Sequence, residues 1–125
     1  APSNHGTRLI PAQNPIADLL PGLICMSCNQ QTWGSSFLAN LNADDETPGD
    51  VSYTQIESKL DEVVVPYTSA FLTPGPNTTN ITLQAKCPLA LAEHILIPTA
   101  RSTIGYTLDA LSHSGPADPA FKPSC

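Results

Sequence analysis

The most informative stretch of this chain is residues 58–66, which read Ser58-Lys59-Leu60-Asp61-Glu62-Val63-Val64-Val65-Pro66. An alternating segment rich in β-branched residues, at 51–56, precedes it and predicts a strand that delivers the chain to Asp61. A second segment of this kind, at 80–85, runs on towards His94, 33 residues after Asp61. Each side chain follows a predicted strand, so we predict that Asp61 and His94 form an acid–base pair.

The order of this pair is informative. In serine hydrolases with an α/β fold, the triad follows the chain order serine, acid, histidine, on loops at the carboxyl edge of the sheet. Asp61 and His94 fit the last two places, and Glu62 is the fallback acid. The nucleophile sits on a G-x-S-x-G turn, but no two of the seven glycines here are four residues apart. We therefore expect no acyl-enzyme chemistry from these 125 residues alone.

Composition limits the classes of protein and partner. A length of 125 residues suits a single domain, and 13 prolines with 13% charged residues predict a loop-rich chain with few long helices. The net charge is −6 and the five basic residues are scattered, so nucleic acid is not an expected partner. The acidic run at 44–46 could bind calcium, but Pro48-Gly49 just after it favours a solvated turn. We expect no metal and no cofactor.

The cysteines and the hydropathy indicate the compartment. Four cysteines suit disulfides in an oxidising environment, and no apolar stretch approaches the ~20 residues of a membrane span, so we predict a secreted, extracellular protein. Neither a basic region nor an apolar core of a signal peptide precedes Ala1, so we expect that any such peptide has been removed or belonged to a longer precursor. Two glycosylation sequons begin at Asn77 and Asn80.

Cys25-x-x-Cys28 allows three interpretations. A thioredoxin-like redox site needs an upstream strand, which the sequence does not supply. A zinc site needs a second closely spaced pair, and Cys87 and Cys125 are too far apart in sequence to provide one. A structural disulfide is the interpretation that we favour.

Two helices are predicted from apolar spacing. Residues 30–42 carry Trp33, Phe37, Leu38 and Leu41 on one helical face. Residues 99–111 carry Ile104, Leu108 and Leu111, with Thr99 or a neighbour as the cap and an irregular tail after Pro116 that Cys125 could anchor. The apolar run 16–24, broken by Pro21-Gly22, predicts short helical turns that either are buried or face lipid. His5 and His113 are predicted to be surface or turn residues.

With these features in place, the chain resembles the secreted lipases related to yeast lipase B and their bacterial relatives. The resemblance covers nearly the whole chain and rests on four segments in the family's order and at similar spacing: 1–7 (APSNHGT), 30–32 (QQT), 58–66 (SKLDEVVVP) and 87–94 (CPLALAEH). Glu93 stands where yeast lipase B has another acid. Cys25-x-x-Cys28 and the earlier end of the tail depart from the yeast enzyme.

The resemblance implies an α/β fold, with residues 1–125 as the C-terminal portion of an α/β-hydrolase and residues 12–45 as cap or lid helices. It implies that Asp61 is the triad acid, that His94 is the base and that Val63 and Val64 face the acyl pocket. It also implies that Cys87 pairs with Cys125. The serine elbow and the oxyanion-hole loop would lie upstream of Ala1, in a missing N-terminal half.

The predicted function is therefore lipase or carboxylesterase activity, such as triacylglycerol hydrolysis at a lipid–water interface, with this chain supplying only the acid and the base. The alternative is a non-enzymatic secreted domain, held together by disulfides, that binds a partner or serves a structural role. In that case Asp61 and His94 are incidental. A thiol–disulfide function through Cys25 and Cys28 is a third and more distant hypothesis.

Overall fold

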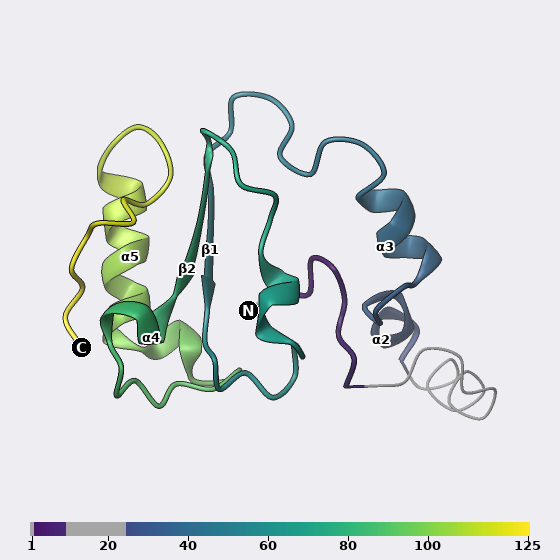
Figure 1. Ribbon diagram of the computed structural model, residues 1–125, viewed down its shortest axis with the longest axis horizontal. Coiled ribbons are helices and arrows are strands. Elements are labelled where there is room, and N and C mark those ends of the chain that lie inside the picture. The colour runs from purple at the N-terminus through teal and green to yellow at the C-terminus, as the bar shows by residue number, and fades with distance from the viewer. Residues whose placement is uncertain (1, 10–24) are drawn as a thin grey trace.

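The centre of the molecule is a pair of parallel strands. The computed structural model describes residues 2–9 and 25–125. Strand β1 (Tyr53–Glu57) pairs with β2 (Thr78–Thr82) in a register that places Tyr53 opposite Thr78 and Glu57 opposite Thr82 (Figure 1). Because the strands are parallel, the segments that follow them leave from the same edge of the sheet. These are the segments that lead to Asp61 and to His94.

Helices lie on both sides of this pair. Helix α5 (Arg101–Ser112) covers one face, whereas the N-terminal segment and the 3-10 helix η1 (Tyr67–Ala70) lie on the other, with α2 (Met26–Gln30) and α3 (Ser36–Leu41) beyond them (Figure 1). Short turns of helix follow β2, namely α4 (Leu83–Lys86) and η2 (Ile97–Thr99). The predicted α/β arrangement is confirmed for the described residues.

The core forms between the sheet and α5. Ile56 and Ile81 are partners in the strand register and point to the same side, where Ile81 joins a fully or nearly buried cluster. The other buried members are Leu83, Ile97, Tyr106 and Ala117. Phe121 packs edge-on against Tyr106 with 5.6 Å between ring centroids, so the C-terminal tail closes this core.

The prediction of one helix over 30–42 is wrong in its extent. Gln30 ends α2, and α3 begins only at Ser36. Gly34 between them has a φ of +76°, a conformation that breaks a right-handed helix. Ser35 then caps α3 by accepting a hydrogen bond from the Leu38 backbone N–H. Trp33 therefore lies in a turn.

Two further boundaries differ from the prediction. The strand predicted over 80–85 ends at Thr82, because Leu83 turns into α4 and is completely buried there. The helix predicted over 99–111 runs from Arg101 to Ser112, and its cap is Ala100, the neighbour of Thr99. Ala100 makes no side-chain capping bond, and the hydroxyl of Thr99 donates to the Leu96 carbonyl. The predicted turns at 16–24 and the first 13 residues of the predicted cap, 12–24, lie outside the described residues. That 25–45 serves as a cap stays a prediction.

The N-terminal segment passes between two parts of the chain. Thr7 forms a parallel bridge with Thr32, while its hydroxyl donates to the Val63 carbonyl. Gly6 makes this passage possible, since its φ is +82° and a Cβ there would lie 2.7 Å from the Thr32 backbone. Among the described residues, no helix is both long and apolar enough to cross a membrane.

Disulfides join both cysteine pairs, with Cα–Cα distances of 5.2 Å for Cys25–Cys28 and 5.4 Å for Cys87–Cys125. The second bond spans 38 residues and returns the tail to the end of α4. The predicted anchor at Cys125 is confirmed.

Replacing Cys87 and Cys125 together by alanine should lower the free energy of unfolding by about 4 kcal/mol, because the longer loop loses more entropy on closure. The matched double replacement of Cys25 and Cys28, which closes a loop of separation 3, should cost only about 2 kcal/mol. Guanidinium unfolding of the purified protein measures both. Equal losses in the two variants would contradict this account.

Candidate active site

Asp61 is a buried carboxylate with its hydrogen bonds supplied locally. Its side chain is fully buried, and Oδ1 accepts the backbone N–H groups of Val63 (2.9 Å) and Val64 (2.7 Å). These donors come from the turn that follows Asp61 itself, so the local sequence orients the acid. A buried carboxylate with such donors keeps its charge more readily than one without them.

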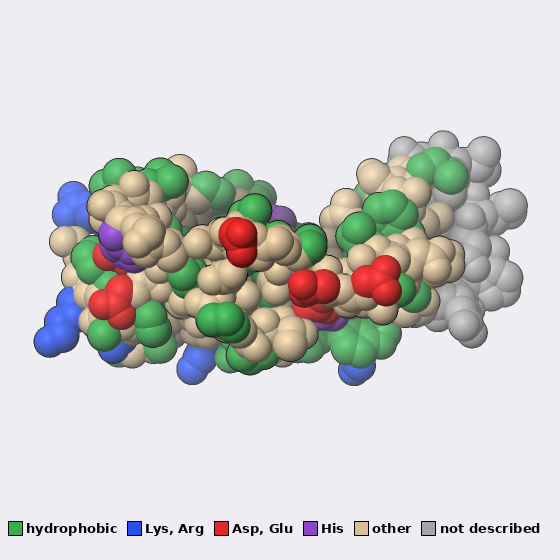
Figure 2. Space-filling model, turned by 90° about the horizontal axis from the view of Figure 1, so that it is seen from above, with side chains coloured by type: hydrophobic (Ala, Val, Ile, Leu, Met, Phe, Trp, Pro, Cys, Tyr) green, Lys and Arg blue, Asp and Glu red, His purple; other side chains and the backbone are tan. Residues whose placement is uncertain are grey.

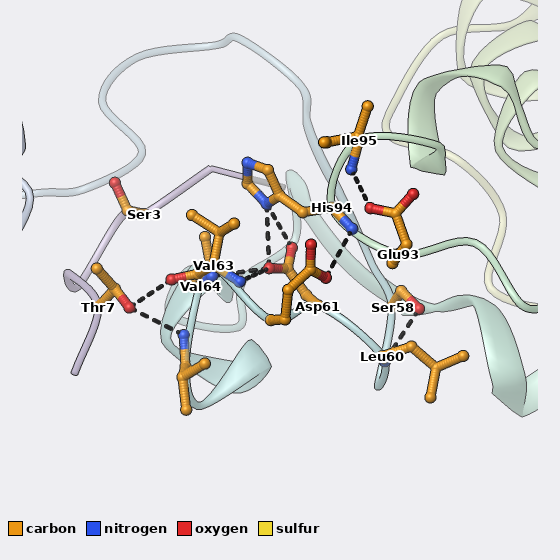
Figure 3. A network of polar contacts seen from close by, with 12 residues as sticks. Ser3, Thr7, Ser58, Leu60, Asp61, Val63, Val64, Glu93, His94 and Ile95 are labelled. Atoms are coloured by element: carbon orange, nitrogen blue, oxygen red, sulfur yellow. Dashed lines mark hydrogen bonds and ion pairs between the residues drawn. The ribbon is translucent and has the colours of Figure 1, made fainter. Parts of the chain in front are cut away.

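His94 meets this carboxylate through one ring nitrogen. Nδ1 lies 2.8 Å from Asp61 Oδ2 and 3.0 Å from Oδ1 (Figure 3). Because a carboxylate only accepts, this contact places the proton on Nδ1 and leaves Nε2 with a lone pair. The other ring nitrogen points away from Asp61 (Figure 3), and the side chain is 28% exposed. The predicted acid–base pair is therefore present as a geometric arrangement.

Two neighbouring glutamates hold the backbone around His94. Glu62 Oε2 accepts the His94 N–H at 3.4 Å, so the fallback acid contacts the backbone while Asp61 takes the ring. Glu93 accepts the N–H groups of Ile95 (2.6 Å) and Leu96 (3.1 Å) and so caps the turn after the histidine. This capping role of Glu93 could not be predicted from the sequence alone.

Glu57 is a second buried acid that sequence reasoning missed. It ends β1 with no exposed surface, and neither carboxylate oxygen has a hydrogen-bond partner among the described residues. Burial raises the pKa of Glu57 to about 8, and the negative charge of Asp61 acts in the same direction. The sequence signal that could have revealed this buried acid is its position directly after the alternating segment 51–56.

The other two histidines have their own acids. His5 Nε2 lies 2.6 Å from Glu46, and its Nδ1 lies 3.1 Å from the Ser69 carbonyl. Burial raises the pKa of Glu46, but hydrogen bonds from Thr73 and His5 outweigh it and leave the pKa below its ordinary value. His113 follows the last residue of α5, lies 3.5 Å from Asp109 and has a side chain that is 40% exposed, which agrees with a surface position. Both pairs are far in sequence from the strand ends that carry Asp61 and His94.

The cysteines and the acidic run at 44–46 have partners within the described part of the chain. All four cysteines are in disulfides, and residues 2–9 and 25–125 contain no group of three or more metal-ligating side chains. Asp44, Asp45 and Glu46 lie along a shared surface hollow, and the carboxylates of Asp45 and Glu46 are occupied by hydrogen bonds to Thr47 and Thr73. The solvated-turn interpretation therefore accounts for this acidic run.

A parallel sheet with helices on both sides, carrying an acid and a histidine at its carboxyl edge, defines part of an α/β-hydrolase-like fold. Comparison with known proteins agrees. Residues 1–94 match the family model described as lipase (class 2), and this chain belongs to that family.

A solved structure extends the likeness. The chain is similar to Aspergillus fumigatus lipase B, with 28% identity and a TM-score of 0.76. The match covers 95% of this chain and 30% of that chain, so the described fold corresponds to less than a third of the lipase B structure. A search of curated proteins returns no match. Val64 is buried and Val63 is half-buried beside Asp61, while their place in an acyl pocket stays a prediction.

Glu57→Gln should change how stability depends on pH. Folding raises the pKa of Glu57 from 4.5 to about 8, so its contribution to stability is complete below pH 4.5 and is lost as the pH rises to about 8. Glutamine does not titrate, so the variant should lack this loss and be the more stable protein above pH 8. Urea unfolding at a series of pH values measures it. Replacement of the exposed Glu62 by glutamine is the control, and an unchanged pH profile in Glu57→Gln would contradict the assignment.

Proposed function

We propose that this chain supplies the general acid–base histidine and its partner carboxylate to a serine ester hydrolase of the lipase type. His94 is the base, Asp61 is its partner, and the serine nucleophile and the oxyanion hole lie outside these 125 residues. The observation that carries the proposal is the 2.8 Å contact between His94 Nδ1 and a fully buried Asp61 carboxylate, with the second ring nitrogen directed away from it.

The chemistry follows from this geometry. The free lone pair of Nε2 accepts the proton of a serine hydroxyl while the serine oxygen attacks the ester carbonyl carbon. Asp61 stabilises the resulting imidazolium, which then returns the proton to the alcohol oxygen as the C–O bond breaks. Water attacks the acyl-enzyme in the same way, with His94 again as the base. In both halves of the reaction, the negative charge of Asp61 stabilises the imidazolium form of His94.

The surface beside His94 favours an apolar substrate. Leu91 and Ile95 flank Glu93 and His94 and are 80% and 74% exposed, and Leu89 is 90% exposed. A row of such side chains next to a base suits esters with medium or long acyl chains and contact with a lipid surface. Triacylglycerols are therefore the substrate class that we favour, with Val63 and Val64 along the acyl chain.

The rest of the proposal concerns assembly and location. In a two-stranded sheet, the outer edge of each strand lacks a neighbouring strand to hydrogen-bond with. Further strands of a hydrolase domain would pair with these edges of β1 and β2. Residues 25–45 would then act as part of a cap. Two disulfides favour an oxidising, extracellular location.

A fluorophosphonate probe tests the proposal. The intact protein should be labelled on a serine outside these 125 residues. Asp61→Asn should reduce both the labelling rate and the hydrolysis of a medium-chain ester by roughly 10⁴-fold, because the amide no longer holds the correct tautomer. Mass spectrometry of every chain locates the label.

The control uses the second aspartate–histidine pair of the chain. Asp109→Asn alters the pair with His113 at the end of α5 and should leave labelling unchanged. No label on any chain would contradict the proposal and favour a disulfide-stapled binding domain. Label within these 125 residues would contradict the claim that the nucleophile lies elsewhere.

A further inference from the structure

A buried hydroxyl joins the loop that carries Asp61 to the segment that carries His94. Ser58 is fully buried just after β1, and its hydroxyl donates to the Ala92 carbonyl at 2.5 Å. The same oxygen accepts the Leu60 N–H at 3.1 Å. Ser58 stands three residues before Asp61, and Ala92 stands two residues before His94. One side chain therefore sets the spacing between the two backbones.

Gln84 completes this connection from α4. Its Nε2 donates to Ser58 Oγ (2.9 Å) and to the Ala90 carbonyl (3.0 Å), while its Oε1 accepts the Lys59 N–H (3.0 Å). The amide thus contacts both the loop after β1 and the segment before His94. Ser58 uses its proton and two acceptor positions in the same network, so the two side chains form one unit.

The segment before His94 needs such a support. Residues 88–94 contain no helix or strand, and η2 begins only at Ile97. Asp61 is fixed by its own turn through Val63 and Val64, but the same turn does not fix the histidine backbone. Apart from the ring contact, the loop after β1 reaches His94 itself through the 3.4 Å bond to Glu62. The bonds of Ser58 and Gln84 therefore carry much of the positioning of the base.

We infer that Ser58 and Gln84 are positioning residues that hold His94 Nδ1 against Asp61. The role in catalysis rests on the proposed function, whereas the role in geometry does not. Small displacements of a catalytic base reduce rate steeply, by up to about 100-fold for a displacement near 1 Å. Loss of the unit should therefore affect turnover more than substrate binding.

The test uses Ser58→Ala, Gln84→Met and the double variant in the intact protein. Proton NMR should show the low-field resonance of the His94 Nδ1 proton weakened or lost in each variant. Turnover of a medium-chain ester should fall by about tenfold to 100-fold with a smaller change in KM. The double variant should lose little more than the worse single variant, since both changes break one network.

Ser69→Ala is the matched control. Ser69 is also a buried serine whose hydroxyl donates to a backbone carbonyl, but that carbonyl belongs to Gly6 (2.6 Å) and not to the segment before His94. It should lower stability without changing the low-field resonance. If the Ser58→Ala variant does not fold, the Gln84→Met variant is used for the test, because Gln84 is only half-buried.

A native resonance in both single variants would overturn the inference. A lost resonance in an intact protein that neither reacts with a fluorophosphonate nor hydrolyses esters would support the positioning role while the proposed function fails. The two failures are therefore distinguishable.

A separate observation concerns the two glycosylation sequons. Asn77 occupies the third place of a turn, 75–78, in which the Thr78 N–H donates to the Gly75 carbonyl at 3.1 Å and Pro76 takes the second place. Residues 73–76 are exposed and Asn77 is partly exposed. This turn leads into the amino end of β2, so it lies at the opposite end of the sheet from Asp61 and His94 (Figure 1).

Asn80 is placed differently. It lies within β2, where its Oδ1 accepts the Leu72 N–H (3.0 Å) and its Nδ2 donates to the Leu72 carbonyl (2.8 Å). Leu72 is itself buried. A sugar on Nδ2 of Asn80 would have to occupy the seam between β2 and this segment.

The structure assigns Asn77, and not Asn80, as the acceptor of an N-linked oligosaccharide. In the transfer, Nδ2 forms a bond to C1 of a sugar carried by a polyprenyl pyrophosphate. The bond from C1 to the pyrophosphate oxygen breaks, the lipid pyrophosphate leaves, and the amide loses one N–H proton. Figure 2 looks from above, from the side of the amino end of the sheet, and shows acidic side chains spread over this face among hydrophobic ones.

Expression of the intact protein in a eukaryotic secretory host, followed by glycosidase treatment and peptide mass analysis, tests this assignment. Asn77→Gln should remove the glycan of its peptide, whereas Thr82→Ala, which destroys the second sequon but keeps the Asn80 amide, should change nothing. A co-expressed glycoprotein verifies that the host is competent. A glycan on Asn80, or none on Asn77, would overturn the assignment.

Discussion

The structure depends on how a fully buried carboxylate, Asp61, is kept in contact with hydrogen-bond donors. A charge removed from water is costly unless donors replace the solvent, and here two backbone N–H groups and the ring of His94 do so. The donors come from different sources. Val63 and Val64 belong to the turn after the acid, whereas His94 arrives from a segment 33 residues further on. The turn is therefore a local property, but the pair with His94 requires the parallel register of β1 and β2.

Glu57 is a buried carboxyl group without hydrogen-bond donors among the described residues. It lies at the end of β1, four residues before Asp61, and its pKa rises to about 8. Burial without donors raises the pKa of Glu57, and the nearby charge of Asp61 raises it further. The protonated form of Glu57 also spares Asp61 a second negative charge nearby. This contrast makes Asp61 the acid suited to accept a histidine N–H.

The sheet and the tail explain how a short, proline-rich chain places this pair. Ile56 and Ile81 put the apolar face of the strands against α5, and Tyr106 with Phe121 closes that core. The disulfide at Cys125 returns the tail to the end of α4, the element that provides Gln84. The segment between α4 and His94 is irregular, so contacts with Ser58 and Gln84 replace the regular backbone bonds that a helix or strand would supply. The class 2 lipase family, to which the chain belongs, is consistent with an acid and a histidine at this edge.

The sequence by itself determined the two strands to within a few residues and the long C-terminal helix, because alternation and helical spacing are local signals. Chain order predicted that Asp61 and His94 would pair, but the parallel register of β1 and β2 brings them together. The sequence also indicated the family, through segments that keep their order along the chain. Only the tertiary structure decided that Gly34 breaks the predicted 30–42 helix, that Leu83 ends β2, and that Glu57 is buried without a donor. These features depend on a positive φ, on the space under α5 and on partners distant in sequence.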